Sequence, residues 1–504
     1  MSKEHSYRQI LRSTSIVGGA SVINIAVGLL RTKVAALLLG PAGVGLIGLL
    51  QSMMTTGASI AGLGVGNVGT RQIAEASATG GLEAVAATRR ALFLLTLMLS
   101  ATGALLFWLL RDELALRVLG DRNGSADVAW LALGLALTVA SASQSALLNG
   151  MRRIGDLARI SVYSGVLSTL AATAAVWWWG RGGILAFVLA APAASFLLGH
   201  WYVAKLGRLQ APATSWSVLA GQWRAMLTLG AAFMVSGLVT NLGQLAARTL
   251  IQRDLGPEAL GHFQAAWLIS MTYLGFVLGA MGTDYYPRLT AVIREPEQVN
   301  RLVNEQTEVA LLLAGPAFLV MLALAPWIIA LLYSSEFSEA VGILRWQVLG
   351  DVLKVASWPL GFVILAAGDG RTYMASESLA IGLFLLLVVL GLPAWGIAST
   401  GIAFLGMYAA YLPLVYVLAH RRTGFRWVPA VRRRLLLLFF ASVAVAGLGA
   451  WRESAALVVG LLAAVGFGLD GFARLGHMAG LGGAVGRLSQ FSRRLMIKIG
   501  VWRE

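Results

Sequence analysis

Apolar stretches long enough to cross a lipid bilayer recur along this chain from one end to the other. A spanning α-helix needs about 20 consecutive, mostly apolar residues. In hydrocarbon every backbone N–H and C=O must be paired within the protein, which leaves helices and closed β-barrels as spanning structures. Barrel strands are short segments of alternating polarity, and this chain has continuous apolar runs instead. The sequence therefore predicts an all-α polytopic membrane protein.

Charge and composition agree with this class. Charged residues make up 12% of the chain, whereas soluble domains carry about 25%. The net charge of +16 does not indicate a nucleic-acid partner, because the basic residues lie at the ends of predicted spans, where they set topology and meet anionic lipid. The chain has no cysteine, and its five histidines are scattered. No thiolate chemistry and no metal site are therefore predicted.

The apolar runs predict about fourteen spans, the last two of them short. They lie at residues 13–39, 42–68, 91–110, 128–150, 160–179, 184–204, 226–251, 261–284, 309–332, 341–367, 373–392, 396–418, 435–450 and 455–469. With the N-terminus inside, the inner segments hold about 28 Lys and Arg and the outer segments about six. This alternation predicts that both termini are cytoplasmic. The ninth run is almost wholly apolar and is predicted to face lipid.

A turn motif occurs twice and indicates a duplicated architecture. Leu39-Gly-Pro-Ala-Gly-Val-Gly45 closes the first span, and Leu255-Gly-Pro-Glu-Ala-Leu-Gly261 follows the seventh; Arg31 and Arg248 precede them. We predict two six-helix lobes, with the substrate site between the repeats as in many transporters. The predicted parts are the lobes 1–208 and 209–424, an added helix pair at 425–472 and a basic tail at 473–504. The tail is either an amphipathic helix on the inner leaflet or a disordered basic segment.

Charged residues lie in the middle of predicted spans. Asp351 and Lys354 are three residues apart, so they share a helix face and can meet; Glu377 is in the next span. Such groups are costly in hydrocarbon and usually face a bundle interior or a water-filled cavity. One interpretation is a structural ion pair. The other is a polar cavity, in which the acids balance the cations when no substrate is bound.

Cations outnumber acids in the spans, so an anion from outside the protein could balance them. We interpret these residues as a cationic lumen for a phosphate-bearing or acidic substrate. Its predicted substrate-binding residues are Arg31, Lys33, Arg248 and Lys354, its acids are Asp351 and Glu377, and its polar lining is Asn24, Gln51, Asn241, Gln244 and Gln264. As alternatives, the amides could only join helices, and Arg31 and Lys33 could extend to the membrane surface.

Three segments resemble one transporter family. The run from Trp346 to Val355, the Leu39-Gly-Pro turn followed by Gln51, and Ala247-Arg248 leading into Gln264 closely resemble the Wzx flippases. These belong to the multidrug/oligosaccharidyl-lipid/polysaccharide exporter superfamily. The resemblance covers the twelve-helix core and leaves the role of the last helix pair open. It implies a MATE-like V of two six-helix lobes around a cationic cavity, in the bacterial inner membrane.

The resemblance also implies a function and its partners. Wzx flippases move undecaprenyl-diphosphate-linked oligosaccharides, such as O-antigen units, enterobacterial-common-antigen lipid or exopolysaccharide repeat units, between leaflets by alternating access. Membrane lipids are expected partners, with the polymerase and chain-length proteins of the pathway as candidates. An ion-coupled drug exporter of the same superfamily is the alternative. No enzyme activity and no cofactor are expected, because no loop is long enough for a catalytic domain; coupling to an H⁺ or Na⁺ gradient is left open.

Overall fold

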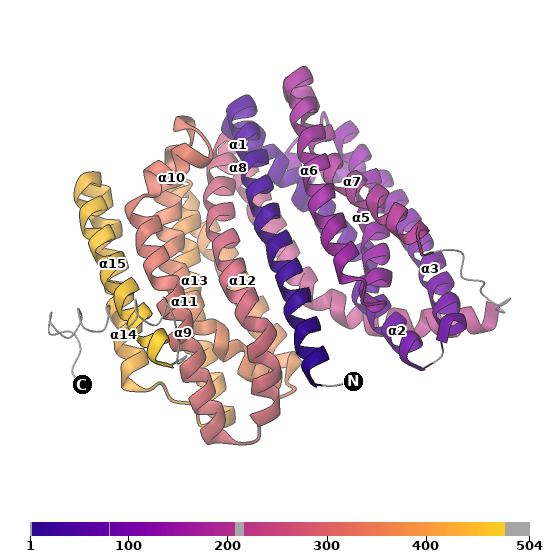
Figure 1. Ribbon diagram of the computed structural model, residues 1–504. Coiled ribbons are helices and arrows are strands. Elements are labelled where there is room, and N and C mark those ends of the chain that lie inside the picture. Colours follow the sequence, from indigo (N-terminus) through magenta and orange to yellow (C-terminus); the bar gives the residue numbers. More distant parts are fainter. Residues whose placement is uncertain (1–2, 80, 207–215, 479–504) are drawn as a thin grey trace. The chain divides into compact units, whose positions relative to one another are not determined.

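A computed structural model describes residues 3–79, 81–206 and 216–478 (Figure 1). Every regular element in this part of the chain is helical, which confirms the predicted fold class. Most of the predicted basic tail, residues 479–504, lies outside the described residues. The chain forms two compact units: unit 1 is Met1–Gly261 with Leu332–Ser334, and unit 2 is His262–Leu331 with Ser335–Glu504. The predicted boundary at residue 208 differs from this division, and the two predicted lobes stay a prediction.

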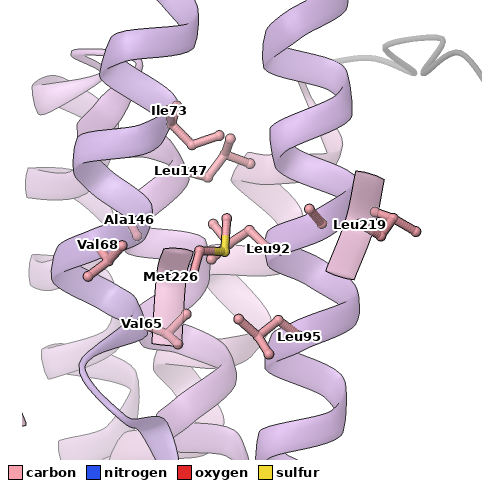
Figure 2. Packing of buried hydrophobic residues seen from close by; sticks show 10 residues of the cluster. Val65, Val68, Ile73, Leu92, Leu95, Ala146, Leu147, Leu219 and Met226 are labelled. Carbon is pink, nitrogen blue, oxygen red and sulfur yellow. The ribbon is translucent and has the colours of Figure 1, made fainter. Parts of the chain in front are cut away.

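Unit 1 contains the first half of the helices. They are α1 (Lys3–Gly62), α2 (Val65–Thr79), α3 (Gly81–Leu109), the short α4 (Arg111–Leu114), a π-helix (Ala115–Leu119), α5 (Ser125–Gly150), α6 (Ile154–Trp179), a 3₁₀ turn (Gly180–Gly183), α7 (Ile184–Ala204) and the first part of α8 (Trp216–Val292). Leu219 and Met226 of α8 pack with Leu92 of α3 and Leu147 of α5 in a buried apolar cluster (Figure 2). The start of α8 therefore belongs to the core of unit 1.

The repeated Leu-Gly-Pro motif forms the two kinks of unit 1. Gly40 within α1 has φ 62° and Gly256 within α8 has φ 85°, a conformation that glycine adopts without steric cost. The proline that follows each has no N–H to donate, which also interrupts the helical bonding. The last glycine of each motif approaches the other motif: a Cβ on Gly45 would lie 2.6 Å from the Pro257 carbonyl oxygen, and one on Gly261 2.0 Å from the Pro41 carbonyl oxygen. The two copies therefore contact each other through their backbones.

Unit 2 is built around α11 (Glu339–Ala366). Its other elements are the second part of α8, α9 (Pro296–Ala323), α10 (Ala325–Leu332), a 3₁₀ turn (Ser335–Phe337), α12 (Gly370–Trp395), α13 (Ala398–Thr423), α14 (Pro429–Trp451) and α15 (Glu453–Met478). The apolar part of α11 is 72% buried, more than any other candidate span. Gly350 permits close packing on α13, because a Cβ there would lie 2.6 Å from Phe404 Cδ1. Polar residues on α11 are consequently held inside the unit.

Within the described residues, ten segments are long and apolar enough to cross a membrane. Two of them, Gly18–Gly62 with 45 residues and Ile154–Ala204 with 51, are each long enough for two crossings. The protein is therefore a multi-pass membrane protein. The predicted number of about fourteen spans is not confirmed by this criterion.

The helix pair α14–α15 packs on α9, which corrects one prediction from the sequence. The apolar run at 309–332 was predicted to face lipid, yet the apolar part of α9 is 61% buried and the helix contacts α11, α14 and α15. Arg434 of α14 pairs with Glu308 of α9 and, at 2.8 Å, with Asp470 of α15. Arg474 lies 3.4 Å from Glu308 and 3.2 Å from Asp470. These four side chains form an ion network that joins the three helices.

Helix α12 begins at a capping aspartate outside the spans. Asp369 accepts hydrogen bonds from the Thr372 N–H at 3.0 Å, from the Thr372 hydroxyl at 2.8 Å, and from Arg422 of α13. The Thr372 N–H, then its hydroxyl and the Arg422 guanidinium, lower the pKa of Asp369 to about 2. The ionised carboxylate therefore stabilises the start of α12.

Replacing Asp369 with alanine is expected to lower the unfolding temperature at neutral pH. An unfolded aspartate has a pKa of about 3.9, so a folded pKa below this value adds stability above about pH 4 and loses it as the pH falls toward 2. The gap between wild type and Asp369→Ala in thermal unfolding of purified protein should thus shrink below about pH 4. A gap that stays constant over this acid range would contradict the assignment.

Candidate functional site

A cluster of polar side chains lies inside unit 2, between α8, α11, α12 and α13. Its centre is Asp351, which is fully buried. One carboxylate oxygen, Oδ2, accepts a hydrogen bond from the Ser270 hydroxyl at 2.6 Å. The other, Oδ1, is buried and has no hydrogen-bond partner among the described residues. A buried carboxylate with one unsatisfied oxygen is costly, so this oxygen is suited to take a proton or contact a cation.

Lys354 lies one turn further along α11 and is half-buried. Its Nζ is 3.3 Å from Met271 Sδ, and 5.8 Å and 5.7 Å from the ring centres of Phe404 and Tyr408. The charges of Asp351 and Glu377 both act on it, but within the described part of the chain it forms no direct ion pair with either. Its contacts are with a sulfur and aromatic faces, which bind an ammonium more weakly than a buried carboxylate does. This cation can therefore accept an anionic partner.

Glu377 of α12 completes the cluster. Its Oε1 accepts a hydrogen bond from the Tyr411 hydroxyl of α13. Tyr411 packs edge-on against Tyr408, with ring centres 6.1 Å apart. The predicted residues Asp351, Lys354 and Glu377 thus lie in one cluster, and the glutamate accepts its hydrogen bond from a tyrosine hydroxyl. The i, i+3 spacing on α11 does not close a structural ion pair.

Gln347 also belongs to this region, although the polar residues predicted from the sequence do not include it. It is fully buried, and neither atom of its amide group has a hydrogen-bond partner among the described residues. Because Gln347 precedes Asp351 by four residues, the two side chains share one face of α11. This i, i+4 spacing from Asp351 is the feature of the sequence that could have identified Gln347. Gln347 adds a buried amide donor and acceptor to the face of α11 that carries Asp351.

In unit 1 the predicted cations make backbone contacts. Arg31 of α1 donates to the Phe187 carbonyl of α7 at 2.5 Å, and its guanidinium lies 4.3 Å from the centre of the Phe187 ring. Its Nε is buried without a partner among the described residues. Lys33 donates to the Tyr333 carbonyl at 2.5 Å. Both side chains are half-buried, so neither extends freely to the membrane surface.

The other polar residues of unit 1 join helices or pair locally. Asn24 of α1 donates to Ser161 of α6 at 2.6 Å, and Asn241 of α8 donates to Ser59 of α1 at 2.8 Å. Arg248 is buried and donates to its own turn at Gln244, at 3.1 Å to the carbonyl and 3.4 Å to the side chain. These contacts agree with a helix-joining role for the two asparagines.

The remaining lining residues, Gln51 of α1 and Gln264 of α8, are half-buried. The predicted lumen draws on residues of both units, and only its unit 2 part is an observed cluster. The joint cationic lumen of Arg31, Lys33, Arg248 and Lys354 therefore stays a prediction.

Known proteins resemble this chain in sequence and fold. Relatives described as "Lipid III flippase", from Escherichia coli (strain K12) and Shigella flexneri, are each 26% identical over 416 residues, which is 80% of this chain and 97% of theirs. Among solved structures, the lipid II flippase MurJ in an inward closed conformation superposes with a TM-score of 0.70 at 10% identity, covering 92% of this chain and 99% of its own. An inward-facing MATE transporter superposes at 0.67 with 15% identity, covering 82% and 99%.

These two structures establish a shared helical fold, because their identities are too low to indicate more. A family model described as "Polysaccharide biosynthesis protein" matches residues 34–342, which is more than half of the chain. The chain therefore belongs to this family of polysaccharide biosynthesis proteins.

Proposed function

We propose that the protein is a flippase that moves an undecaprenyl-diphosphate-linked oligosaccharide from the cytoplasmic to the periplasmic leaflet of the bacterial inner membrane. The observation that carries this proposal is the match to relatives named lipid III flippase along 97% of their length. Membership of a polysaccharide biosynthesis family supports the same substrate class. O-antigen, common-antigen-like and exopolysaccharide repeat units all have this chemistry.

The chemistry of such a substrate requires a polar path through the membrane. Its diphosphate and sugars are strongly hydrated, and moving them unaided into hydrocarbon costs many kcal/mol because their hydrogen bonds with water are lost. Its polyprenyl tail can stay in the lipid throughout. A flippase therefore has to replace water around the head group only, and alternating access lets it do so without opening a continuous pore.

Lys354 supplies the cation for this step in unit 2. A diphosphate or acidic sugar would replace the weak contacts that its Nζ makes with Met271 and the aromatic rings. Asp351 and Glu377 would hold the charge balanced when the substrate is absent. Arg31, Lys33 and Arg248 are proposed to serve the same anion from unit 1.

Asp351 is the residue we propose for coupling to an H⁺ or Na⁺ gradient. Its free Oδ1 and the unsatisfied amide of Gln347 are buried on the same face of α11. A proton on Asp351 would remove its attraction for Lys354, and the lysine would then be available to the anionic substrate. Loss of that proton would favour release.

The function is tested by deleting the gene and following the lipid-linked glycan. We expect the glycan to accumulate in the cytoplasmic leaflet, where a membrane-impermeant glycan-modifying reagent added to spheroplasts cannot reach it. The gene supplied on a plasmid should restore access. Normal translocation in the deletion strain, together with new sensitivity to small toxic cations, would instead identify a drug exporter.

A further inference from the structure

A cavity of ≈ 410 Å³ lies within unit 1, between α3, α5 and α7. It is separate from the polar cluster of unit 2. Leu92 and Leu147 line it, and both are buried members of the apolar cluster in Figure 2. The cavity therefore has a firm apolar wall, formed by the core of the unit.

Basic and polar side chains line the same cavity. Arg89 and Arg90 come from α3, His200 from α7, and Gln144 from α5. The Gln144 Oε1 atom is buried and has no hydrogen-bond partner among the described residues. It lies against α7, since a Cβ on Gly199 would be 2.2 Å from it. The two guanidinium groups and the imidazole supply hydrogen-bond donors that match the oxygens of a phosphate group. The Gln144 oxygen accepts hydrogen bonds and is not one of these donors.

The cavity adjoins an exposed apolar strip on α3. Phe93 lines the cavity and is 62% exposed, and Leu97, one turn further along, is 53% exposed. Because Phe93 follows Arg89 by four residues and Leu97 follows Phe93 by four, the three share one helix face. A ligand in the cavity therefore meets charge at one end and an apolar strip toward the middle of the membrane.

The surrounding end of unit 1 is positively charged. At this end, residues 70–90, 150–160 and 204–206 carry seven basic and three acidic residues: Arg71, Arg89, Arg90, Arg152, Arg153, Arg159 and Lys205 against Glu75, Glu83 and Asp156. The connections at the opposite end, residues 110–128 and 180–183, carry four of each: Arg111, Arg117, Arg122 and Arg181 against Asp112, Glu113, Asp121 and Asp127. These residues give a net charge of +4 near the cavity and of zero at the opposite end. The excess of positive charge favours an anionic ligand near the cavity.

From these observations we propose that the cavity binds the phosphate of an anionic phospholipid, with the acyl chains along Phe93 and Leu97. A soluble phosphate would use the basic residues equally well, whereas a phospholipid would in addition place its acyl chains on the exposed strip beside the cavity. The combination of a basic cavity and an apolar strip favours a lipid. This site does not depend on the proposed flippase function.

The site is tested by native mass spectrometry of the purified full-length protein with phosphatidylglycerol or phosphatidylcholine of the same acyl chains. Wild type is expected to retain phosphatidylglycerol preferentially. Arg90→Gln together with His200→Gln should weaken retention about tenfold, in keeping with the loss of charged hydrogen bonds. Arg90 and His200 are both exposed, and thermal unfolding checks that the variant remains folded.

Arg152→Gln is the matched control. It removes one positive charge at the same end of unit 1, outside the cavity lining. A loss of retention as large as in the cavity variant would show only unspecific charge attraction and would overturn the proposal. Phe93→Ser should weaken lipid retention as well. Displacement of the lipid by millimolar inorganic phosphate would also overturn it, because the site would then prefer a soluble anion.

Discussion

Replacing Arg434 with methionine is expected to destabilise unit 2 by about 3–5 kcal/mol, the usual effect of removing one partner from a buried ion pair. Methionine fills similar space but leaves the carboxylates of Glu308 and Asp470 with Arg474 as their remaining partner in the network. Two acids facing one base in a partly buried site keep an uncompensated negative charge. The measurement is thermal or denaturant unfolding of the purified protein in detergent.

Arg433→Met is the control for this experiment. Arg433 is the neighbour of Arg434 on α14 and is exposed, whereas Arg434 is buried. Both variants lose one positive charge, so a difference between their unfolding free energies measures the contribution of the ion network. Adding Asp470→Asn to Arg434→Met should recover part of the stability, because one uncompensated acid is then removed. Equal stability of the two single variants would show that the network does not hold α14 and α15 on α9.

Replacing Lys354 with methionine is expected to reduce translocation by about 10- to 100-fold, which corresponds to the 1.5–3 kcal/mol of a hydrogen bond to a charged group. The cluster then lacks the cation that is proposed to meet the substrate anion. Unfolding should change little, because Lys354 is not held in a direct ion pair. The rate is measured in proteoliposomes that contain a fluorescent lipid-linked glycan, as the fraction accessible to a reagent outside.

Two comparisons make the Lys354 experiment specific. Arg371→Met removes a positive charge from an exposed position at the start of α12, outside the cluster, and should translocate normally. Lys354→Arg keeps the charge and should retain more activity than the methionine variant. Wild-type translocation by folded Lys354→Met would remove this residue from the proposed substrate site.

Much of the fold and part of the site could be predicted from the sequence. Continuous apolar runs determine the helical class, because lipid leaves the backbone few alternatives. The repeated Leu-Gly-Pro motif was recognised, and the structure adds that it forms kinks at Gly40 and Gly256. Asp351, Lys354 and Glu377 were selected because charge within a span is costly. These features can be predicted because the cost of exposing backbone polar groups or charges to lipid limits which residues a span can contain.

Other features depended on packing that no local pattern reveals. The run beginning at residue 309 is apolar whether it faces lipid or another apolar helix, so its cover by α14 and α15 could not be predicted. Arg434 belongs to a basic cluster that reads as a membrane-surface segment, and only its contacts with Glu308 and Asp470 show its structural role. Gln347 was missed because a single amide in a span is common. Only the position of α11 at the centre of unit 2 shows that the Gln347 amide is buried without a hydrogen-bond partner among the described residues.

The contact between the two Leu-Gly-Pro motifs also bears on how this protein can evolve. Gly45 rests on the carbonyl of Pro257, and Gly261 on the carbonyl of Pro41, so each copy of the motif is the packing partner of the other. Here a side chain gained at either glycine would press against the backbone of the opposite copy, where no substitution can make room. A substitution at either glycine is thus expected to be selected against, and the two glycines should be retained together.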